Sequence, residues 1–390
     1  MTDHPTTLAV LGSTGSVGRQ ALDVARAHSI PVDLLAAHGS VDAMEADARA
    51  LCPRVCVLAD ASAARTLAIR LADTPVRVLG GEEALLSAIA ESPATVFVNA
   101  VLGSAGLLPS LAVLEKGARL ALANKESLVV AGDILLDTAR RTGAEILPVD
   151  SEHGAIHQCL SFGKRSAVKR LILTASGGPF RGYRREQLAS VTKREALAHP
   201  TWKMGEKITV DSATMMNKGF EIIEAARLFG MSADRVDVLV HPESIIHSMV
   251  EYIDNTVAAQ LSLPDMCACV QYAITYPERR EAVIPPLDLA ALGSLTFHRP
   301  DPEAFPALAL ARAAVERGGT APSVLNAADE VAVAAFLREE IPFPAIVDTV
   351  SEVVARIASP AATLPDILAA DAEARRITAA LISALRKDTL

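Results

Sequence analysis

Short apolar runs alternate with longer amphipathic stretches through the first part of the chain. The amphipathic stretches, such as Arg19–Ala27 and Ala61–Leu71, place alanine and leucine at the spacing of one helix face. Apolar runs separated by helices of this length are typical of βαβ units. Residues 1–150 are therefore predicted to form an α/β domain with a doubly wound parallel sheet. The predicted strands are Leu8–Leu11, Asp33–Ala37, Val55–Leu58, Val76–Leu79, Thr95–Val98, Arg119–Leu122 and Ile146–Val149.

The pattern changes after residue 150. Residues 151–277 mix strands with irregular polar segments and predict a central α+β domain, and the proline-rich residues 278–306 predict a linker. Residues 307–390 are amphipathic throughout and predict a C-terminal helical bundle. The predicted strands of the central domain are Arg170–Thr174, Val236–Val240, Ile246–Ile253 and Thr256–Ser262, the last two paired as a hairpin through Asp254-Asn255. The predicted helices of the bundle are Ala307–Arg317, Ser323–Arg338, Phe343–Ser359 and Asp366–Leu385.

Composition and charge narrow the class of protein. The 390 residues are 51% hydrophobic and 21% charged, which suits two or three domains with large packed cores. The formal net charge of -9 argues against a nucleic acid or an anionic membrane as the main partner. The start of the chain lacks a basic signal-peptide region, and the five scattered cysteines are expected to be free thiols. These features together predict a cytoplasmic protein.

Three glycines follow the first predicted strand in Gly12-Ser13-Thr14-Gly15-Ser16-Val17-Gly18. Glycines between a strand and a helix let the backbone turn sharply and approach a pyrophosphate, which the helix N-terminus then faces. The spacing differs from the usual GxGxxG pattern, and a tight turn without a ligand is the alternative. The position of the motif at the start of a βαβ array favours a Rossmann-like dinucleotide-binding domain.

The end of the second predicted strand indicates which dinucleotide is bound. An NAD-specific site would place an acid here for the ribose 2′-hydroxyl, but the chain has His38-Gly39-Ser40. A histidine and a serine suit a 2′-phosphate better, so NADPH is the preferred cofactor.

Two carboxylates leave the last strand of the first domain in Asp150-Ser151-Glu152-His153. Oxygen ligands are those that Mg²⁺ and Mn²⁺ select, and both acids can point at one cation. The alternative is that Asp150 caps the next helix and Glu152 lies in its first turn. Lys125 follows the preceding strand and is predicted to lie in the same cleft, although a solvated lysine is its simpler interpretation.

Further polar residues predict an anion pocket and a third metal carboxylate. If the chain is helical from Ala213, then Asn217, Lys218 and Glu221 share one face, where the last two could also simply pair. Ser176, Ser212, Asn217 and Lys218 suit a phosphate, and Glu221 could join Asp150 and Glu152. The segment with Trp202 suits a mobile lid or core packing. In the bundle, Asn326, Asp329 and Glu330 are expected to be capping and surface residues. The whole set suggests metal-assisted chemistry on a phosphorylated hydroxy-ketone with hydride transfer.

Seven motifs resemble those of the 1-deoxy-D-xylulose 5-phosphate reductoisomerase family, in order and at family spacing from about residue 8 to 385. They are Gly12-Ser-Thr-Gly-Ser-Val-Gly18, Ala123-Asn-Lys-Glu-Ser127, Leu147-Pro-Val-Asp-Ser-Glu-His153, Ser176-Gly-Gly-Pro-Phe180, His199-Pro-Thr-Trp-Lys-Met-Gly205, Asp211-Ser-Ala-Thr-Met-Met-Asn-Lys-Gly219 with Glu221, and His241-Pro-Glu-Ser-Ile-Ile-His247.

The resemblance implies NADPH- and metal-dependent conversion of 1-deoxy-D-xylulose 5-phosphate to 2-C-methyl-D-erythritol 4-phosphate, in the non-mevalonate isoprenoid pathway. It also implies a V-shaped, cytoplasmic homodimer. Asp150, Glu152 and Glu221 would hold Mg²⁺, Mn²⁺ or Co²⁺, and Lys125 would donate a proton beside Ser151. The implied substrate contacts are Lys125, Ser151, Glu152, Ser176, His199, Trp202, Ser212, Asn217, Lys218 and Glu221, with Trp202 and Met204 in a lid. The implied cofactor contacts are Thr14, Gly15, Ser16, Val17, His38, Gly39, Ser40, Asn124, Glu126, Gly205 and Met266.

One departure from the family and two rival functions remain. Some family members place a lysine and an asparagine where this chain has Gly39 and Ser40, which leaves the 2′-phosphate with weaker partners. A metal-dependent oxidative decarboxylase of a 2-hydroxy acid would also combine a nicotinamide, a cation and a lysine, but it would need an arginine-rich pocket. A nucleotide-sensing scaffold that had lost catalysis would usually lack one of the acids or Lys125, and all are present.

Overall fold

The computed structural model describes residues 6–202, 204–357, 359–360 and 363–388. The chain folds into two compact units. The first unit consists of Met1–Ser127, Leu135–Gly154 and Asp265–Pro286, and the second of Leu128–Ile134, Ala155–Pro264 and Leu287–Leu390.

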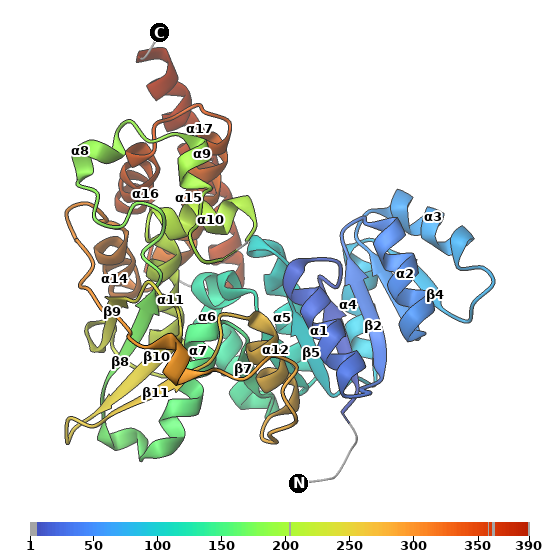
Figure 1. Ribbon diagram of the computed structural model, residues 1–390. Helices are drawn as coiled ribbons and strands as arrows, with labels where there is room; N and C mark the ends of the chain where they lie inside the picture. The colour runs from blue at the N-terminus through green and yellow to red at the C-terminus, as the bar shows by residue number, and fades with distance from the viewer. Residues whose placement is uncertain (1–5, 203, 358, 361–362, 389–390) are drawn as a thin grey trace. The chain divides into compact units, whose positions relative to one another are not determined.

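A seven-stranded sheet forms the centre of the first unit, with strand order β4-β3-β2-β1-β5-β6-β7 (Figure 1). Every neighbouring pair is parallel, so the predicted doubly wound sheet is confirmed. The order reverses between β1 and β5, which is where ligands bind in open α/β sheets. The strands are β1 Leu8–Leu11, β2 Val32–Ala37, β3 Val55–Leu58, β4 Arg77–Gly80, β5 Val96–Asn99, β6 Arg119–Leu122 and β7 Ile146–Pro148.

Helices connect these strands and cover the sheet. They are α1 Ser16–Ala27, α2 Val41–Leu51, α3 Ala61–Arg70, α4 Glu82–Glu91, α5 Leu107–Glu115, α6 Lys125–Thr142, α7 Ser151–Cys159 and α12 Met266–Thr275. Leu128–Ile134 of α6 and the part of α7 from Ala155 onward belong to the second unit. Figure 1 shows α12 beside α1, and Val270, Ala273 and Ile274 of α12 belong to the same buried core as the sheet. A segment distant in sequence therefore completes this unit.

A second sheet, with order β11-β10-β8-β9, belongs to the second unit. Its strands are β8 Val168–Ala175, β9 Val236–Val240, β10 Ile246–Tyr252 and β11 Val257–Leu261. β10 is antiparallel to both β8 and β11, and β8 is parallel to β9. The predicted hairpin is confirmed, because Asn255 takes up a left-handed conformation (φ 66°) in the turn between β10 and β11.

The helices of the second unit include the four predicted at the C-terminal end. They are α8 Arg185–Leu188, α9 Lys193–Ala196, α10 Glu206–Ala213, α11 Met216–Leu228, α13 Leu289–Leu292, α14 Ala307–Arg317, α15 Ala321–Leu337, α16 Pro344–Ile357 and α17 Leu364–Asp388. Short 3₁₀ turns lie at Gly103–Gly106, Leu160–Phe162, Arg165–Ala167 and Ala233–Arg235. The predicted linker contains α13 and a β-bridge from His298 to Val240.

A helix from Ala213 onward was the condition for the shared face of Asn217, Lys218 and Glu221, and the helix that carries all three begins slightly later, at Met216. α10 ends at Ala213, and Met215 has a left-handed backbone (φ 63°) that breaks the helix before α11 begins at Met216. A residue with left-handed backbone angles cannot continue a right-handed helix, so α10 and α11 are separate helices.

Each unit has its own apolar core. All five cysteines are free. Across the described ranges, the helices lack the combination of length and apolar character that crossing a bilayer requires.

Candidate active site

The glycine turn after β1 lets α1 pack tightly against the strand. Gly12 has a positive φ of 86°, and a Cβ at Gly18 would lie 2.1 Å from the Gly12 carbonyl oxygen. Only glycine therefore allows α1 to start this close to the strand. The helix begins at Ser16, so the backbone N–H groups of its first turn face the predicted pyrophosphate site.

A negative charge that the sequence analysis missed lies next to the end of β2, on Asp60 at the N-cap of α3. The Asp60 backbone N–H donates to the His38 carbonyl at 2.8 Å, and a Cβ at Gly39 would lie 3.9 Å from Asp60 Oδ2. Hydrogen bonds from the Ala63 and Ser62 backbone amides lower the pKa of Asp60. An ionised carboxylate thus lies beside the predicted 2′-phosphate position. The N-cap pattern before α3 could have revealed it.

Asn124 organises the loops after β5 and β6. It is buried at the N-cap of α6, where its Oδ1 accepts a hydrogen bond from the Ser127 backbone at 3.0 Å. Its Nδ2 donates to the carbonyls of Val101 (2.7 Å) and Gly103 (2.8 Å), and also to Glu126 Oε2 (3.2 Å). These bonds hold the backbone that presents Lys125.

Lys125 and Asp150 lie together at the ends of neighbouring strands, as predicted. Lys125 Nζ is 2.5 Å from Asp150 Oδ2, and both side chains are largely buried. α7 begins at Ser151, whose hydroxyl donates to Glu152 Oε2 at 2.6 Å. The Asp150 carbonyl also accepts the Gly154 backbone N–H at 2.8 Å. The acids therefore lie at the start of a helix, as the alternative interpretation expected, and the metal site stays a prediction.

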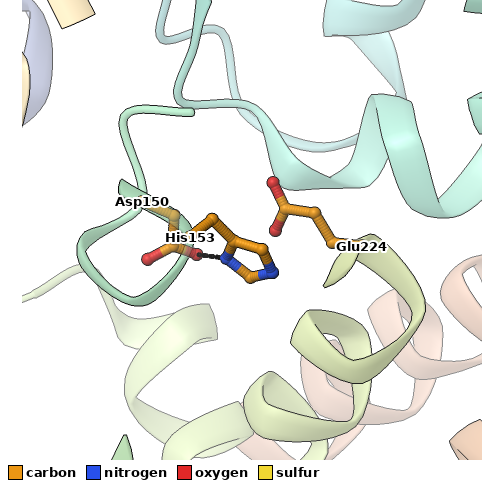
Figure 2. A group of neighbouring side chains, drawn as sticks. All are labelled: Asp150, His153 and Glu224. Carbon is orange, nitrogen blue, oxygen red and sulfur yellow. Dashed lines mark ion pairs between the residues drawn. The ribbon is translucent and has the colours of Figure 1, made fainter. Parts of the chain in front are cut away.

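His153 lies next to Asp150. Figure 2 shows its Nδ1 facing the Asp150 carboxylate, at 3.9 Å, and the ring is fully buried. The same view includes Glu224, a fully buried carboxylate on α11 that the sequence analysis did not single out. Its spacing of three residues from Glu221, inside an apolar helix, was the available signal.

The shared face predicted for Asn217, Lys218 and Glu221 is present on α11. Asn217 Nδ2 donates to Glu221 Oε1 at 2.7 Å, and Lys218 Nζ donates to Oε2 at 2.5 Å. Glu221 is 1% exposed and Lys218 4% exposed. Lys218 and Glu221 therefore form an ion pair, as the alternative interpretation expected, and a role of Glu221 as a metal ligand stays a prediction.

Ser176 and His199 form a second polar pair in the same unit. His199 Nε2 is 2.9 Å from Ser176 Oγ, while Nδ1 accepts from the backbone N–H groups of Thr201 (3.2 Å) and Trp202 (2.9 Å). The proton of the neutral ring is therefore on Nε2 and points at Ser176. Burial lowers the pKa of His199, which favours this neutral form.

The loop after Ser176 packs against α10. A Cβ at Gly178 would lie 2.8 Å from the Ser212 carbonyl oxygen, and Gly178 has a positive φ of 62°. The second unit also contains a cavity of about 330 Å³. It is lined by Gly178, Pro179, Phe180, Arg181, Tyr183, Glu195, Ala198 and Pro200.

The residues of the predicted lid are partly exposed. Trp202 and Met204 are half-buried, and Gly205 is exposed at the N-cap of α10. Lys203, which lies between them in the motif, is outside the described residues. Met266, predicted to lie near the nicotinamide, opens α12 in the first unit and is half-buried.

The fold and the site define a dinucleotide-dependent α/β enzyme, with Lys125 and Asp150 at the carboxyl ends of parallel strands. Comparison with known proteins narrows this class. Residues 8–132 match the 1-deoxy-D-xylulose 5-phosphate reductoisomerase family, 146–229 match its C-terminal domain, and 261–377 match the DXP reductoisomerase C-terminal domain. The chain belongs to the 1-deoxy-D-xylulose 5-phosphate reductoisomerase family.

Curated relatives and solved structures agree. The reductoisomerase of Acetivibrio thermocellus is 49% identical, covering 96% of this chain and 99% of that protein. That of Ralstonia nicotianae is 50% identical over 95% and 96%. The reductoisomerase of Zymomonas mobilis in complex with NADPH is 42% identical, with a TM-score of 0.92 over 97% of this chain and 99% of that one. A DOX-P reductoisomerase with NADPH, fosmidomycin and magnesium is 38% identical, with a TM-score of 0.92 over 98% and 99%.

Proposed function

We propose that this enzyme rearranges 1-deoxy-D-xylulose 5-phosphate and reduces the product to 2-C-methyl-D-erythritol 4-phosphate, as a step of the non-mevalonate isoprenoid pathway. Family membership supports the reaction, and the solved relatives with NADPH and magnesium support the cofactors. The observation that carries the proposal is the pairing of carboxylates with lysines, Asp150 with Lys125 and Glu221 with Lys218.

The residues fit both cofactors. Asp150 and Glu152 of the first unit and Glu221 of the second would hold the divalent cation, because their oxygens suit Mg²⁺, Mn²⁺ or Co²⁺. The backbone N–H groups at the start of α1, directly after the glycine turn, suit a pyrophosphate. When bound, the cation would polarise the carbonyl and neighbouring hydroxyl oxygens of the substrate, and NADPH would supply hydride.

The side chains of the site would bind and orient the substrate. Lys125 would hold a proton beside the reacting oxygens, with Ser151 and Glu152 next to it. Ser176, His199, Ser212, Asn217 and Lys218 would bind the phosphate and the carbon chain through hydrogen bonds and one ammonium. Trp202 and Met204 would cover the substrate and exclude water.

The cofactor would lie along the first unit. Its pyrophosphate would contact Thr14, Gly15, Ser16 and Val17, and its 2′-phosphate would lie at His38, Gly39 and Ser40. Asn124, Glu126 and Met266 of this unit, and Gly205 of the second unit, would complete the binding site. We assign residues 1–150 to cofactor binding, 151–277 to metal and substrate binding and dimerisation, 278–306 to a linker, and 307–390 to the C-terminal helical domain.

NADPH oxidation with 1-deoxy-D-xylulose 5-phosphate and Mg²⁺ tests the reaction. We expect turnover that EDTA abolishes and Mg²⁺ restores. Glu221→Gln removes a charge while keeping the shape of the side chain, so it should lose nearly all activity. Glu352→Gln, on the exposed part of α16, is the control and should retain it. Undiminished turnover of Glu221→Gln would contradict the metal assignment.

A cytoplasmic homodimer is part of the same proposal. The five free thiols suit a reducing compartment. β11 is an edge strand whose first residue, Val257, is 46% exposed, and Ile253, which directly follows β10, is 68% exposed. An apolar sheet edge is a surface that pairing with a second copy would cover. Light scattering should give twice the chain mass of 41.0 kDa. Val257→Lys should shift the protein toward the monomer, while Ile69→Lys, at an exposed isoleucine of α3, should not.

A further inference from the structure

Two buried carboxylates surround one lysine next to the proposed phosphate site. Lys207 Nζ lies 2.6 Å from Asp211 Oδ2 and 2.9 Å from Asp329 Oδ2. Asp211 is 2% exposed and Asp329 is fully buried. The expectation of capping and surface residues was therefore wrong for Asp329, and also for Asn326, which is fully buried inside α15.

This cluster, Lys207, Asp211 and Asp329, connects three helices of the second unit. Lys207 and Asp211 lie one turn apart on α10, and Asp329 reaches them from α15. The Lys207 ammonium also lies 4.8 Å from the ring centre of Phe220 on α11. α10 also carries Ser212, and α11 carries Asn217 and Lys218. The cluster therefore contacts both helices that would bind the phosphate.

Burial of these charges is costly, which calls for an explanation other than stability. A buried ion pair often contributes little to stability compared with apolar packing, and its value can lie in fixing one geometry. Burial and the Asp329 carboxylate beside it raise the pKa of Asp211 well above its ordinary range, opposed by Lys207. The charge of the Asp211 carboxyl thus depends on its two neighbours.

The geometry of α10 shows what such a constraint would achieve. The helix spans only Glu206–Ala213, and its N-cap is Gly205, which has no side chain to cap it. The left-handed backbone of Met215 prevents the helix from continuing at its C-terminal end. A helix this short is marginal without tertiary contacts. The ion pair between Asp329 and Lys207 would fix the rotation of α10 about its axis. The rotation of α10 in turn sets the direction of Ser212, the residue after Asp211.

We propose that Asp329 is a positioning residue, which fixes Lys207 and Asp211 and through them aims Ser212 of α10 at the phosphate of the substrate. The inference rests on the proposed function, which assigns the phosphate to Ser212. Asp329 itself touches neither the substrate nor the cofactor in this scheme.

Steady-state kinetics of Asp329→Asn and Asp329→Leu test the inference. We expect KM for the substrate, and Ki for inorganic phosphate as a competitor, to rise about 3-fold in Asp329→Asn and about 10-fold in Asp329→Leu, on the scale of a neutral and of a charge-assisted hydrogen bond. KM for NADPH should stay within about twofold. Glu330→Gln is the matched control, because Glu330 is the next residue of α15 and pairs with Arg375 of α17 instead. It should change neither KM.

Combination with Ser212→Ala shows whether Asp329 acts through Ser212. We expect the double variant Ser212→Ala/Asp329→Asn to have the substrate KM of Ser212→Ala alone, because the serine that Asp329 positions is already missing. Additive effects of the two substitutions on the substrate KM would overturn the inference. An equal rise of the KM values for the substrate and for NADPH would also overturn it. If Asp329→Leu does not fold, Asp329→Asn alone decides the outcome. An unchanged KM in Ser212→Ala would also remove it, whereas the NADPH oxidation assay would still decide the proposed reaction.

Discussion

The Lys125 ammonium lies 2.5 Å from the Asp150 carboxylate, where β6 and β7 end side by side. Parallel pairing brings these residues together although 25 positions separate them, because Leu122 and Pro148 are in register. The pair places a cation, a carboxylate and two strand ends at one point of the sheet edge. Ligands of open α/β sheets bind on this side of the sheet, outside the carboxyl ends of the strands.

Replacement of Lys125 tests its proposed role as proton donor. Lys125→Met keeps most of the apolar stem but removes the ammonium, so kcat should fall roughly 100-fold or more, the usual contribution of a positioned acid. Lys164→Met, at an exposed lysine, is the control. Full kcat in Lys125→Met would show that another group supplies the proton.

A positive charge after β2 should strengthen NADPH binding. At Gly39 a Cβ would make only ordinary contacts, the closest at 3.5 Å, so a lysine fits there. We expect Gly39→Lys to lower KM for NADPH roughly fivefold, equivalent to about 1 kcal/mol for an exposed ion pair. KM for NADH should not change, because it lacks the 2′-phosphate. The unmodified enzyme should already prefer NADPH; equal kcat/KM for both cofactors would refute that.

Asp60→Asn examines the same position from the opposite charge. Asparagine caps a helix as well as aspartate does, so α3 should stay intact. Removal of the negative charge should lower KM for NADPH and leave that for NADH unchanged. An equal change for both would mean that the carboxylate acts on the fold and not on the 2′-phosphate.

Acidification should disturb the segment around Trp202. Burial lowers the pKa of His199 from its ordinary value near 6.5, so between that value and the folded pKa the unfolded chain binds more protons. Stability from this group is therefore present above pH 6.5 and decreases as the pH falls below it. Protonation of Nδ1 also removes the acceptor for the Thr201 and Trp202 amides.

Fluorescence of Trp202, the single tryptophan, can report this transition. We expect a reversible change with a midpoint below pH 6.5. His199→Gln cannot titrate and should lack it. The same titration curve in the variant would assign the change to other groups.

Arg227 should be needed for stability rather than for chemistry. Its Nη1 donates to the carbonyls of Leu128 (2.6 Å) and Val129 (2.7 Å), where α6 is interrupted at Ala131. Arg227→Met would leave both buried carbonyls without this donor. We expect a loss of about 3 kcal/mol in the free energy of unfolding, measured in urea, since each unsatisfied buried group costs roughly 1–3 kcal/mol. Arg140→Met, on the exposed face of α6, should cost less than about 0.5 kcal/mol. Equal losses would contradict this role.

Short-range spacing in the sequence was enough to predict the doubly wound sheet, the glycine turn and the polar face of α11. The signals were the alternation of strands and helices, a motif of seven residues, and neighbours three or four positions apart on a helix. The hairpin at Asn255 and the four C-terminal helices are local in the same way.

Which residues are buried together became clear only from the packing of distant segments. Asp329 was expected at the surface because the sequence of α15 alone does not show that α10 packs against it. Asp60 near Gly39 and the return of α12 to the first sheet likewise involve contacts between remote parts of the chain. Burial, and with it charge pairing, depends on the packing of the whole unit, which the local pattern of hydrophobic and polar residues does not specify.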